Sequence, residues 1–301
     1  MESLRGTAVD YFLHIAIVIG IFIILSVSLD LMAGYTGMLS LAHAAFFGVG
    51  AYSYALLATR VHVNFLTATF FAMMISSLLG ALIGYPSLRI RLDYFAITTL
   101  ALQVVLVSVF NNLVSVTGGP MGFTDIAQAS VGNWVVTTKA GYLVLTGATA
   151  LMVIAVSWLI VSGSTGRVLR AIREDEVFTE SLGINVASYK IVITAISASL
   201  ASLAGCVYAA YFSFIDPSSF SLSESIFIIS IVIVGGAGSI SGPVVGACVL
   251  VSLPEALRFL GLPSAVAANL RQIIYGLLLI VLMLWRPRGF RGTFGFGSRI
   301  Q

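Results

Sequence analysis

Long apolar runs alternate with short polar stretches along the whole chain. A membrane-crossing helix needs about 20 apolar residues, whereas a membrane-spanning strand alternates apolar and polar positions, which these runs do not do. The pattern therefore predicts an all-α fold, a polytopic bundle of transmembrane helices. Seven spans are expected, at residues 12–29, 41–59, 65–85, 94–116, 141–161, 191–214 and 267–285.

One further apolar stretch, residues 225–257, is interrupted by glycines and a proline. At 1.5 Å per residue it gives about 50 Å of helix, which is short of two full crossings and a turn. It is either a pair of short helices or a re-entrant hairpin, so about 8 to 9 membrane segments are expected in all. The interruption consists of Gly235, Gly236, Gly238, Gly242 and Pro243.

Composition supports a single membrane domain over residues 1–301. Hydrophobic residues make up 59% of the chain and charged residues 9%, whereas soluble domains carry about 25% charged residues. Both cysteines, Cys206 and Cys248, fall in apolar runs without a Cys-x-x-Cys pair, so no metal or redox site is expected. The first apolar run is interpreted as a retained helix, not as a signal peptide.

Basic residues gather in three segments that span counting places on one face of the membrane. By the positive-inside rule this face, and the C-terminus with it, is cytoplasmic. The side of the N-terminus stays open, because it lies outside if 41–59 crosses fully and inside if that segment is re-entrant. The three basic groups are Arg89 and Arg91; Arg167, Arg170, Arg173 and Lys190; and Arg286, Arg288, Arg291 and Arg299.

Charge is concentrated in residues 165–185, which are too polar to cross a membrane. Helix-forming residues run from Val168 to Leu182 and are followed by Gly183, a residue typical of helix ends. We expect a short amphipathic surface helix, although a solvated loop is the alternative. The residues predicted to share its apolar face are Val168, Leu169, Ile172, Thr179 and Leu182.

A short pattern occurs twice, as Gly34-x-x-Gly37-x-x-Ser40 and as Gly235-x-x-Gly238-x-x-Ser241. Internal duplication would explain the match, but glycine and serine are also common where membrane helices pack closely. Under either interpretation these segments are predicted sites of broken helices.

Several blocks resemble the branched-chain amino-acid permease family of ABC importers, in that family's order and over nearly the whole chain. The longest runs from Gly34-Tyr-Thr-Gly-Met-Leu-Ser-Leu-Ala-His43 to Tyr52. The others are Tyr94-Phe-Ala-Ile-Thr-Thr-Leu-Ala-Leu, Thr117-Gly-Gly-Pro-Met-Gly-Phe, Ala171-Ile-Arg-Glu-Asp-Glu, Gly235-Gly-Ala-Gly-Ser-Ile-Ser-Gly-Pro243 and Arg286-Pro-Arg-Gly-Phe.

This resemblance implies a permease subunit of a binding-protein-dependent importer in a bacterial or archaeal inner membrane. Its expected partners are a second homologous permease, two ATPase subunits, an extracytoplasmic solute-binding protein and membrane lipid, and no nucleic acid. The expected solute is a branched-chain amino acid or a related small polar molecule such as urea or an amide. The segment 165–185 resembles the part of such permeases that couples to the ATPase. The candidate coupling residues are Arg167, Arg170, Arg173, Glu174, Asp175, Glu176, Glu180 and Gly183.

No nucleotide-binding Gly-x-x-x-x-Gly-Lys-[Ser/Thr] loop occurs, and the two lysines, Lys139 and Lys190, lie in other contexts. We therefore expect no cofactor on this chain, no enzymatic activity and no catalytic residues, with ATP and Mg²⁺ held by partner subunits.

The solute path is expected near the glycine-broken segments, because unwound backbone and hydroxyl groups suit a zwitterionic solute. Ordinary hydrogen bonding between helices explains the same polar residues. His43 is a functional candidate because it is an ionisable group in an apolar span, although a buried, hydrogen-bonded histidine explains it equally well. The candidates are Tyr35, Thr36, Ser40, His43, Gly235 and Gly238.

Two other classes of protein compete with the importer subunit. An ion-coupled secondary carrier also has broken helices, but it usually keeps an acid in the membrane, and here only Asp30 and Glu255 lie close to an apolar core. An intramembrane hydrolase could pair Ser40 with His43, but no Gly-x-Ser-x-Gly turn is present.

Overall fold

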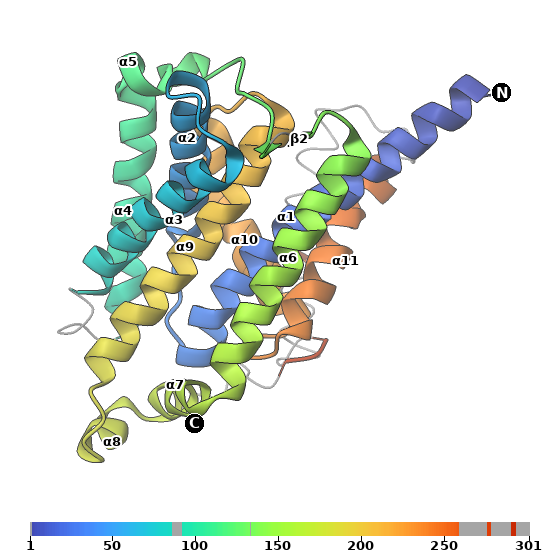
Figure 1. Cartoon of the computed structure of the whole chain (residues 1–301). Helices are drawn as coiled ribbons and strands as arrows, with labels where there is room; N and C mark the ends of the chain where they lie inside the picture. Colours follow the sequence, from blue (N-terminus) through green and yellow to red (C-terminus); the bar gives the residue numbers. More distant parts are fainter. Residues whose placement is uncertain (1, 86–91, 133, 259–275, 278–289, 293–301) are drawn as a thin grey trace.

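The structure is a computed structural model that describes residues 2–85, 92–132, 134–258, 276–277 and 290–292. Long helices dominate it, and a ribbon of two short strands lies at one end (Figure 1). The predicted all-α bundle is confirmed. The helices are α1 (Glu2–Thr36), α2 (His43–Arg60), α3 (Phe65–Gly84), α4 (Leu92–Asn112), α5 (Val114–Thr117), α6 (Lys139–Ser162), α7 (Ser164–Glu174), α8 (Glu176–Ser181), α9 (Val186–Phe212), α10 (Leu222–Gly235) and α11 (Ser241–Arg258). The other elements are the 3₁₀ turns η2 (Gly119–Met121) and η3 (Pro217–Phe220) and the strands β1 (Ser130–Val131) and β2 (Trp134–Val135).

Five helices in the described part of the chain are long and apolar enough to cross a membrane. They are α3 and α9, together with Val9–Thr36 of α1, Tyr94–Asn112 of α4 and Lys139–Ser162 of α6. All five coincide with predicted spans, and α1 continues seven residues beyond the predicted end at residue 29. Apart from residues 276–277, the predicted span at 267–285 lies outside the described residues.

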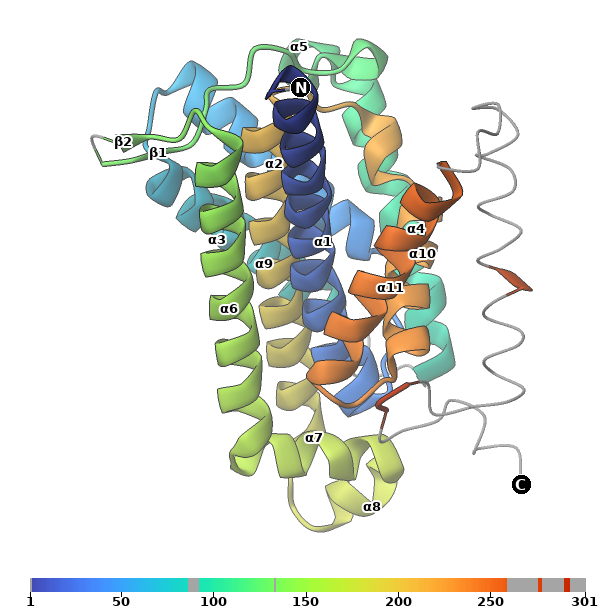
Figure 2. The same ribbon diagram turned by 90° about the vertical axis from the view of Figure 1, so that its right-hand side faces the viewer.

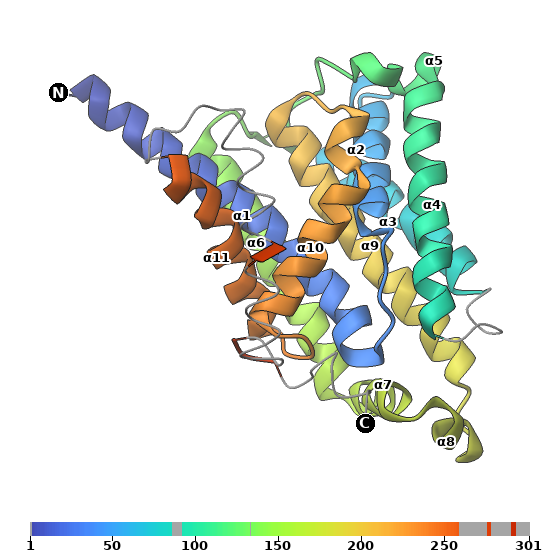
Figure 3. The ribbon, with the colours of Figure 1, turned by 180° about the vertical axis from the view of Figure 1, so that it is seen from behind.

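The predicted span at 41–59 is helical from His43 onward, and the non-helical residues 37–42 before α2 include the break that the repeated glycine pattern predicts. Figure 3 shows this stretch rising from the end of α1 beside α7 towards α2. The stretch and α2 together carry the chain to the opposite end of the bundle. The start of α1 therefore lies at the end of the bundle opposite α7, and the full-crossing interpretation stays a prediction.

Residues 222–258 form a helical hairpin in which α10 and α11 lie side by side (Figure 2). Its turn, residues 236–240, lies at the same end of the bundle as α7. The 14 residues of α10 span about 21 Å, less than the hydrocarbon thickness of about 30 Å. Both predicted alternatives return the chain to the face that it left, and the structure does the same.

Helix α2 lies inside the bundle, where small residues allow close packing against α9. A Cβ atom on Gly50 would overlap the backbone of Ser202, and one on Gly205 would overlap the carbonyl of Phe47. Small residues at such crossings are typical of membrane helices, which gain little hydrophobic free energy from association in lipid. This contact fixes α2 in the core and sets the position of the segment before it.

Candidate functional site

The charged segment 165–185 forms two helices at one end of the bundle, so the single predicted helix from Val168 to Leu182 is wrong (Figure 1). Helix α7 ends where the backbone of Asp175 becomes extended. The Asp175 carboxylate then accepts a hydrogen bond of 2.9 Å from the Phe178 N–H, which makes Asp175 the N-cap of α8. Gly183 adopts a positive φ of 81° just after Leu182, the C-cap residue of α8, as expected for a residue that ends a helix.

Helix α7 packs one apolar side against the ends of α1 and α6. Leu169 and Ile172 are buried there, and Gly166 leaves room for the carbonyl of Val161. Thr179 of α8 is also buried. Leu182 is 63% exposed, so its predicted place on the buried face is wrong, because the break at Asp175 turns α8 away from the axis of α7.

Arg173 links α7 to the end of α1. Its side chain is buried, and its Nη1 donates a hydrogen bond of 2.7 Å to the carbonyl of Gly34. Its Nη2 also forms an ion pair of 3.0 Å with Glu174. The last carbonyls of a helix lack partners within the helix and carry partial negative charge, so an arginine donor stabilises them.

Asp30 links α1 to the turn of the α10–α11 hairpin. It is buried, and its Oδ1 accepts a hydrogen bond of 2.8 Å from the Gly238 N–H. A Cβ atom on Gly34 would overlap both the Asp30 carboxylate and the Gly238 nitrogen, so the glycine permits this approach. We call Asp30, Gly34, Arg173 and Gly238 the junction, because these four residues connect α7, α1 and the hairpin.

Helix α8 is tied to α9 by an ion pair between Glu176 and Lys190. Lys190 is almost fully buried, with 2% of its side chain exposed. A buried ammonium without its carboxylate would be strongly unfavourable. Each of the two short helices is therefore fastened to a different long helix, α7 to α1 and α8 to α9.

The apolar residues of α8 that face away from the bundle give this end of the molecule an exposed surface. Val177 is 77% exposed and Phe178 is 61% exposed, and Leu182 follows directly after the helix. The neighbouring acids Glu174 and Glu180 are exposed as well. We call Val177, Phe178 and Leu182 the α8 patch.

Three of the residues predicted along the solute path, Thr36, Ser40 and His43, are buried and have side chains bonded to protein groups. The Thr36 hydroxyl donates to the carbonyl of Met32 at 2.6 Å, and the Ser40 hydroxyl accepts from the Ala42 N–H at 3.3 Å. His43 Nε2 lies 2.8 Å from the Ser28 hydroxyl. These bonds are what ordinary helix packing requires, and the pathway role of these residues stays a prediction.

The two predicted glycines lie at the hairpin turn, and Tyr35 lines a cavity. Gly235 ends α10, where a Cβ atom would overlap the backbone of Gly242. The structure thus brings Tyr35, Gly235 and Gly238 to the α7 end of the bundle, while His43 lies deeper, at the start of α2.

Several polar side chains accept hydrogen bonds from backbone N–H groups just before α2 and in its first turn. The sequence did not single these side chains out. Thr99 accepts from the Leu41 N–H, Ser225 from Ala44 and Gln103 from Ala45, at 2.9–3.0 Å. Gln103 also donates to the carbonyl of Phe220. Non-helical backbone inside a membrane is tolerated only where protein or water satisfies it, and here α4 and α10 do so.

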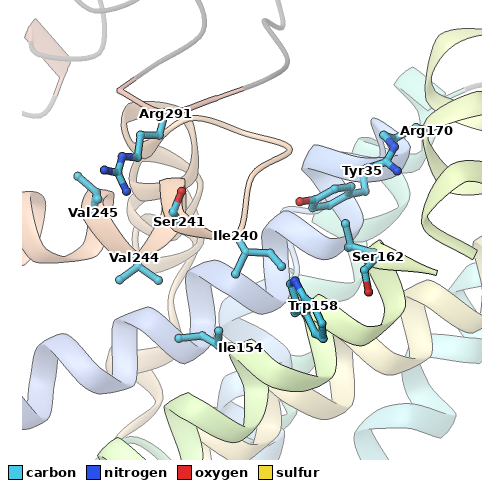
Figure 4. A pocket seen from close by; sticks show the side chains of 11 residues that line it. Tyr35, Ile154, Trp158, Ser162, Arg170, Ile240, Ser241, Val244, Val245 and Arg291 are labelled. Atoms are coloured by element: carbon cyan, nitrogen blue, oxygen red, sulfur yellow. The ribbon is translucent and has the colours of Figure 1, made fainter.

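A cavity of about 670 Å³ opens beside the junction, between the ends of α1 and α6, helix α7 and the hairpin turn (Figure 4). It is lined by Tyr35, Ile154, Trp158, Val161, Ser162, Arg170, Ile240, Ser241, Val244, Val245 and Arg291.

Comparison with known proteins identifies the family. The sequence profile of the family described as "Branched-chain amino acid transport system / permease component" matches residues 11–283. The high-affinity branched-chain amino acid transport system permease protein LivM of Salmonella typhimurium is 32% identical, over 89% of this chain and 67% of that protein. The LivM protein of Escherichia coli is 31% identical, over 95% of this chain and 70% of that protein.

More distant similarity extends to a sugar permease. The ribose import permease protein RbsC of Escherichia coli is 28% identical, over 74% of this chain and 70% of that protein. No solved structure matches the chain significantly.

Proposed function

Because the chain belongs to the family of permease components of branched-chain amino acid transport systems, we propose that it is the membrane subunit of an ATP-driven importer of branched-chain amino acids. It is a multi-pass protein of a transport permease family, and in this proposal it catalyses no reaction itself. In this proposal ATP and Mg²⁺ bind to partner ATPase subunits, a second permease completes the membrane part, and a binding protein delivers the solute.

The observation that carries the proposal is the α7–α8 segment and its attachment through Arg173. A segment that transmits motion from an ATPase needs an outer surface that binds the ATPase. It also needs an inner connection to the helices that move. The α8 patch offers the outer surface. The hydrogen bonds of Arg173 with Gly34 and of Asp30 with Gly238 offer the inner connection, from α7 to α1 and onward to the hairpin.

In the proposed mechanism, ATP-driven closure of the ATPases displaces α8 and α7 together. The Arg173 bond passes the displacement to α1, and the ion pair between Glu176 and Lys190 passes it to α9. Coupling of this kind requires two states with different contacts. The junction is where we expect those contacts to change.

The proposal places the α7–α8 end in the cytoplasm. Arg167, Arg170 and Arg173 lie at this end, and Arg291 lies there too, because its N–H bonds to the carbonyl of Gly235 at the hairpin turn. Basic residues gather on the cytoplasmic side of membrane proteins. The C-terminus would accordingly be cytoplasmic and the start of α1 extracytoplasmic.

Affinity purification of the full-length chain from native membranes tests the assembly. We expect ATPase subunits and a second permease to co-purify, and their absence would count against the proposal. Uptake of labelled leucine by the reconstituted complex, in competition with isoleucine, valine and urea, tests the solute class. Competition by urea but not by isoleucine or valine would replace amino acids with amides.

A further inference from the structure

The cavity beside the junction (Figure 4) has the features of a binding site that transport itself does not require. We propose that it binds an anionic phospholipid from the membrane leaflet at the α7 end, with its headgroup phosphate near Arg170 and Arg291.

The cavity opens at the end of an outward-facing apolar stripe on α6. Val144, Leu151 and Trp158 recur at seven-residue intervals and are 66%, 68% and 58% exposed. Residues at this spacing lie on one face of a helix. This face of α6 therefore points away from the bundle, and the cavity can be entered from the lipid alongside it.

The lining combines an aliphatic wall with aromatic side chains. The wall consists of Ile154 and Val161 of α6 together with Ile240, Val244 and Val245 at the hairpin. Trp158 and Tyr35 supply the amphipathic rings that are enriched where membrane proteins meet the lipid headgroups. Such a lining suits acyl chains on one side and a polar headgroup on the other.

Two arginines provide the charge. Figure 4 shows Arg170 and Arg291 on opposite sides of the cavity. Within the described part of the chain, neither guanidinium group forms a hydrogen bond or an ion pair. Basic pockets between helices near the cytoplasmic surface are typical binding sites for anionic headgroups.

The charge balance distinguishes a phospholipid from the transported solute. An amino acid carries an ammonium group as well as a carboxylate, but no aspartate or glutamate is among the lining residues. An ammonium group would lie near two positive charges without a carboxylate partner. A phosphate with an acyl tail satisfies both the arginines and the aliphatic wall.

Trp158 serves as a reporter, because brominated acyl chains quench tryptophan fluorescence on contact. The full chain with Trp134→Phe and Trp285→Phe is reconstituted into vesicles containing brominated phosphatidylglycerol or brominated phosphatidylcholine. We expect stronger quenching by the anionic lipid, with a preference on the order of fivefold for each arginine. The preference should fall in Arg170→Gln and in Arg291→Gln and vanish in the double variant.

The matched control is Arg167→Gln, an equal charge change on an exposed residue of α7 outside the cavity, which should retain the preference. Equal quenching by both lipids, or a preference unchanged in the double variant, would overturn the proposal. So would Trp158 fluorescence that neither lipid quenches, because protein would then cover the cavity. Loss of the preference on adding millimolar leucine or inorganic phosphate would indicate a solute or free-ion site instead. None of these results depends on transport activity.

Discussion

Arg173 is a charged side chain whose burial is explained by its partners. It donates to the last turn of α1 and pairs with Glu174, so both its position and its charge are accounted for. Under the proposed mechanism it transmits motion from α7 to α1.

Arg173→Gln should therefore uncouple transport from ATP hydrolysis. A hydrogen bond to a charged group contributes about 1.5–3 kcal/mol, so we expect uptake per ATP hydrolysed to fall about tenfold or more. Arg60→Gln, at the opposite end of the bundle, is the control. If the variant keeps its uptake per ATP, Arg173 does not transmit the movement.

Asp30 holds the hairpin turn through a single backbone N–H. Asp30→Asn keeps an oxygen that can accept this bond, whereas Asp30→Ala removes it, and such a bond contributes about 0.5–1.5 kcal/mol. We expect the alanine variant to have the lower thermal unfolding temperature and the lower uptake. Equal behaviour of the two variants would show that the bond does not hold the turn.

Gly34 matters because of the space that it leaves for the hairpin turn. Gly34→Ala should lower the unfolding temperature and the uptake rate, since the added methyl group overlaps the Asp30 carboxylate and the Gly238 nitrogen. Gly147→Ala on α6 is the matched control, because a Cβ there meets no atom within 4 Å. The control should be neutral or stabilise the helix by up to about 1 kcal/mol. If both variants unfold alike, the close approach is not a constraint.

Polar residues in apolar segments could be found from the sequence, but their partners could not. Ser40 and His43 stand out as polar positions, yet the bond between His43 and Ser28 depends on how α1 packs against α2. The sequence marks Asp30 only as an acid near an apolar core. Its partner Gly238 lies 208 positions away, and no local pattern encodes such a pairing.

Among the helices, those with long apolar runs were the most predictable. Helices α3, α4, α6 and α9 follow their apolar runs closely, because lipid requires every backbone group to be bonded within the helix. The break before α2 follows the repeated glycine pattern, which predicts a broken helix there, whereas the pattern does not predict the break at Asp175. In both places side chains form hydrogen bonds with backbone groups, so the helix can end there while its backbone groups stay bonded. Hydropathy does not detect such hydrogen bonds.

The exposed α8 patch should be the contact with the ATPase. Phe178→Ser removes its largest side chain, and aromatic anchors carry much of the binding free energy of interfaces, so we expect the affinity for the ATPase to fall about tenfold or more. Binding of purified ATPase to the chain in nanodiscs measures this. Met121→Ser, an exposed residue at the opposite end, is the control. Unchanged affinity in Phe178→Ser would place the contact elsewhere.

For the molecule as a whole, the proposed mechanism makes transport depend on partner subunits. The carrier alternative requires an acid that can bind and release an ion, but Asp30 is buried and engaged by the Gly238 N–H. The contacts that run from α8 and α7 through the junction link an exposed end of the molecule to the helices inside the bundle. Under the proposed mechanism, the movement of the helices is therefore imposed from outside this chain.

The most direct test is accumulation of labelled leucine in vesicles that contain the purified chain alone, under an inward gradient of sodium ions or protons. The proposed mechanism predicts no accumulation above the external concentration, and accumulation only when the partner permease, ATPases, binding protein and ATP are added. Accumulation against a leucine gradient by the chain alone, driven by either ion, would contradict it.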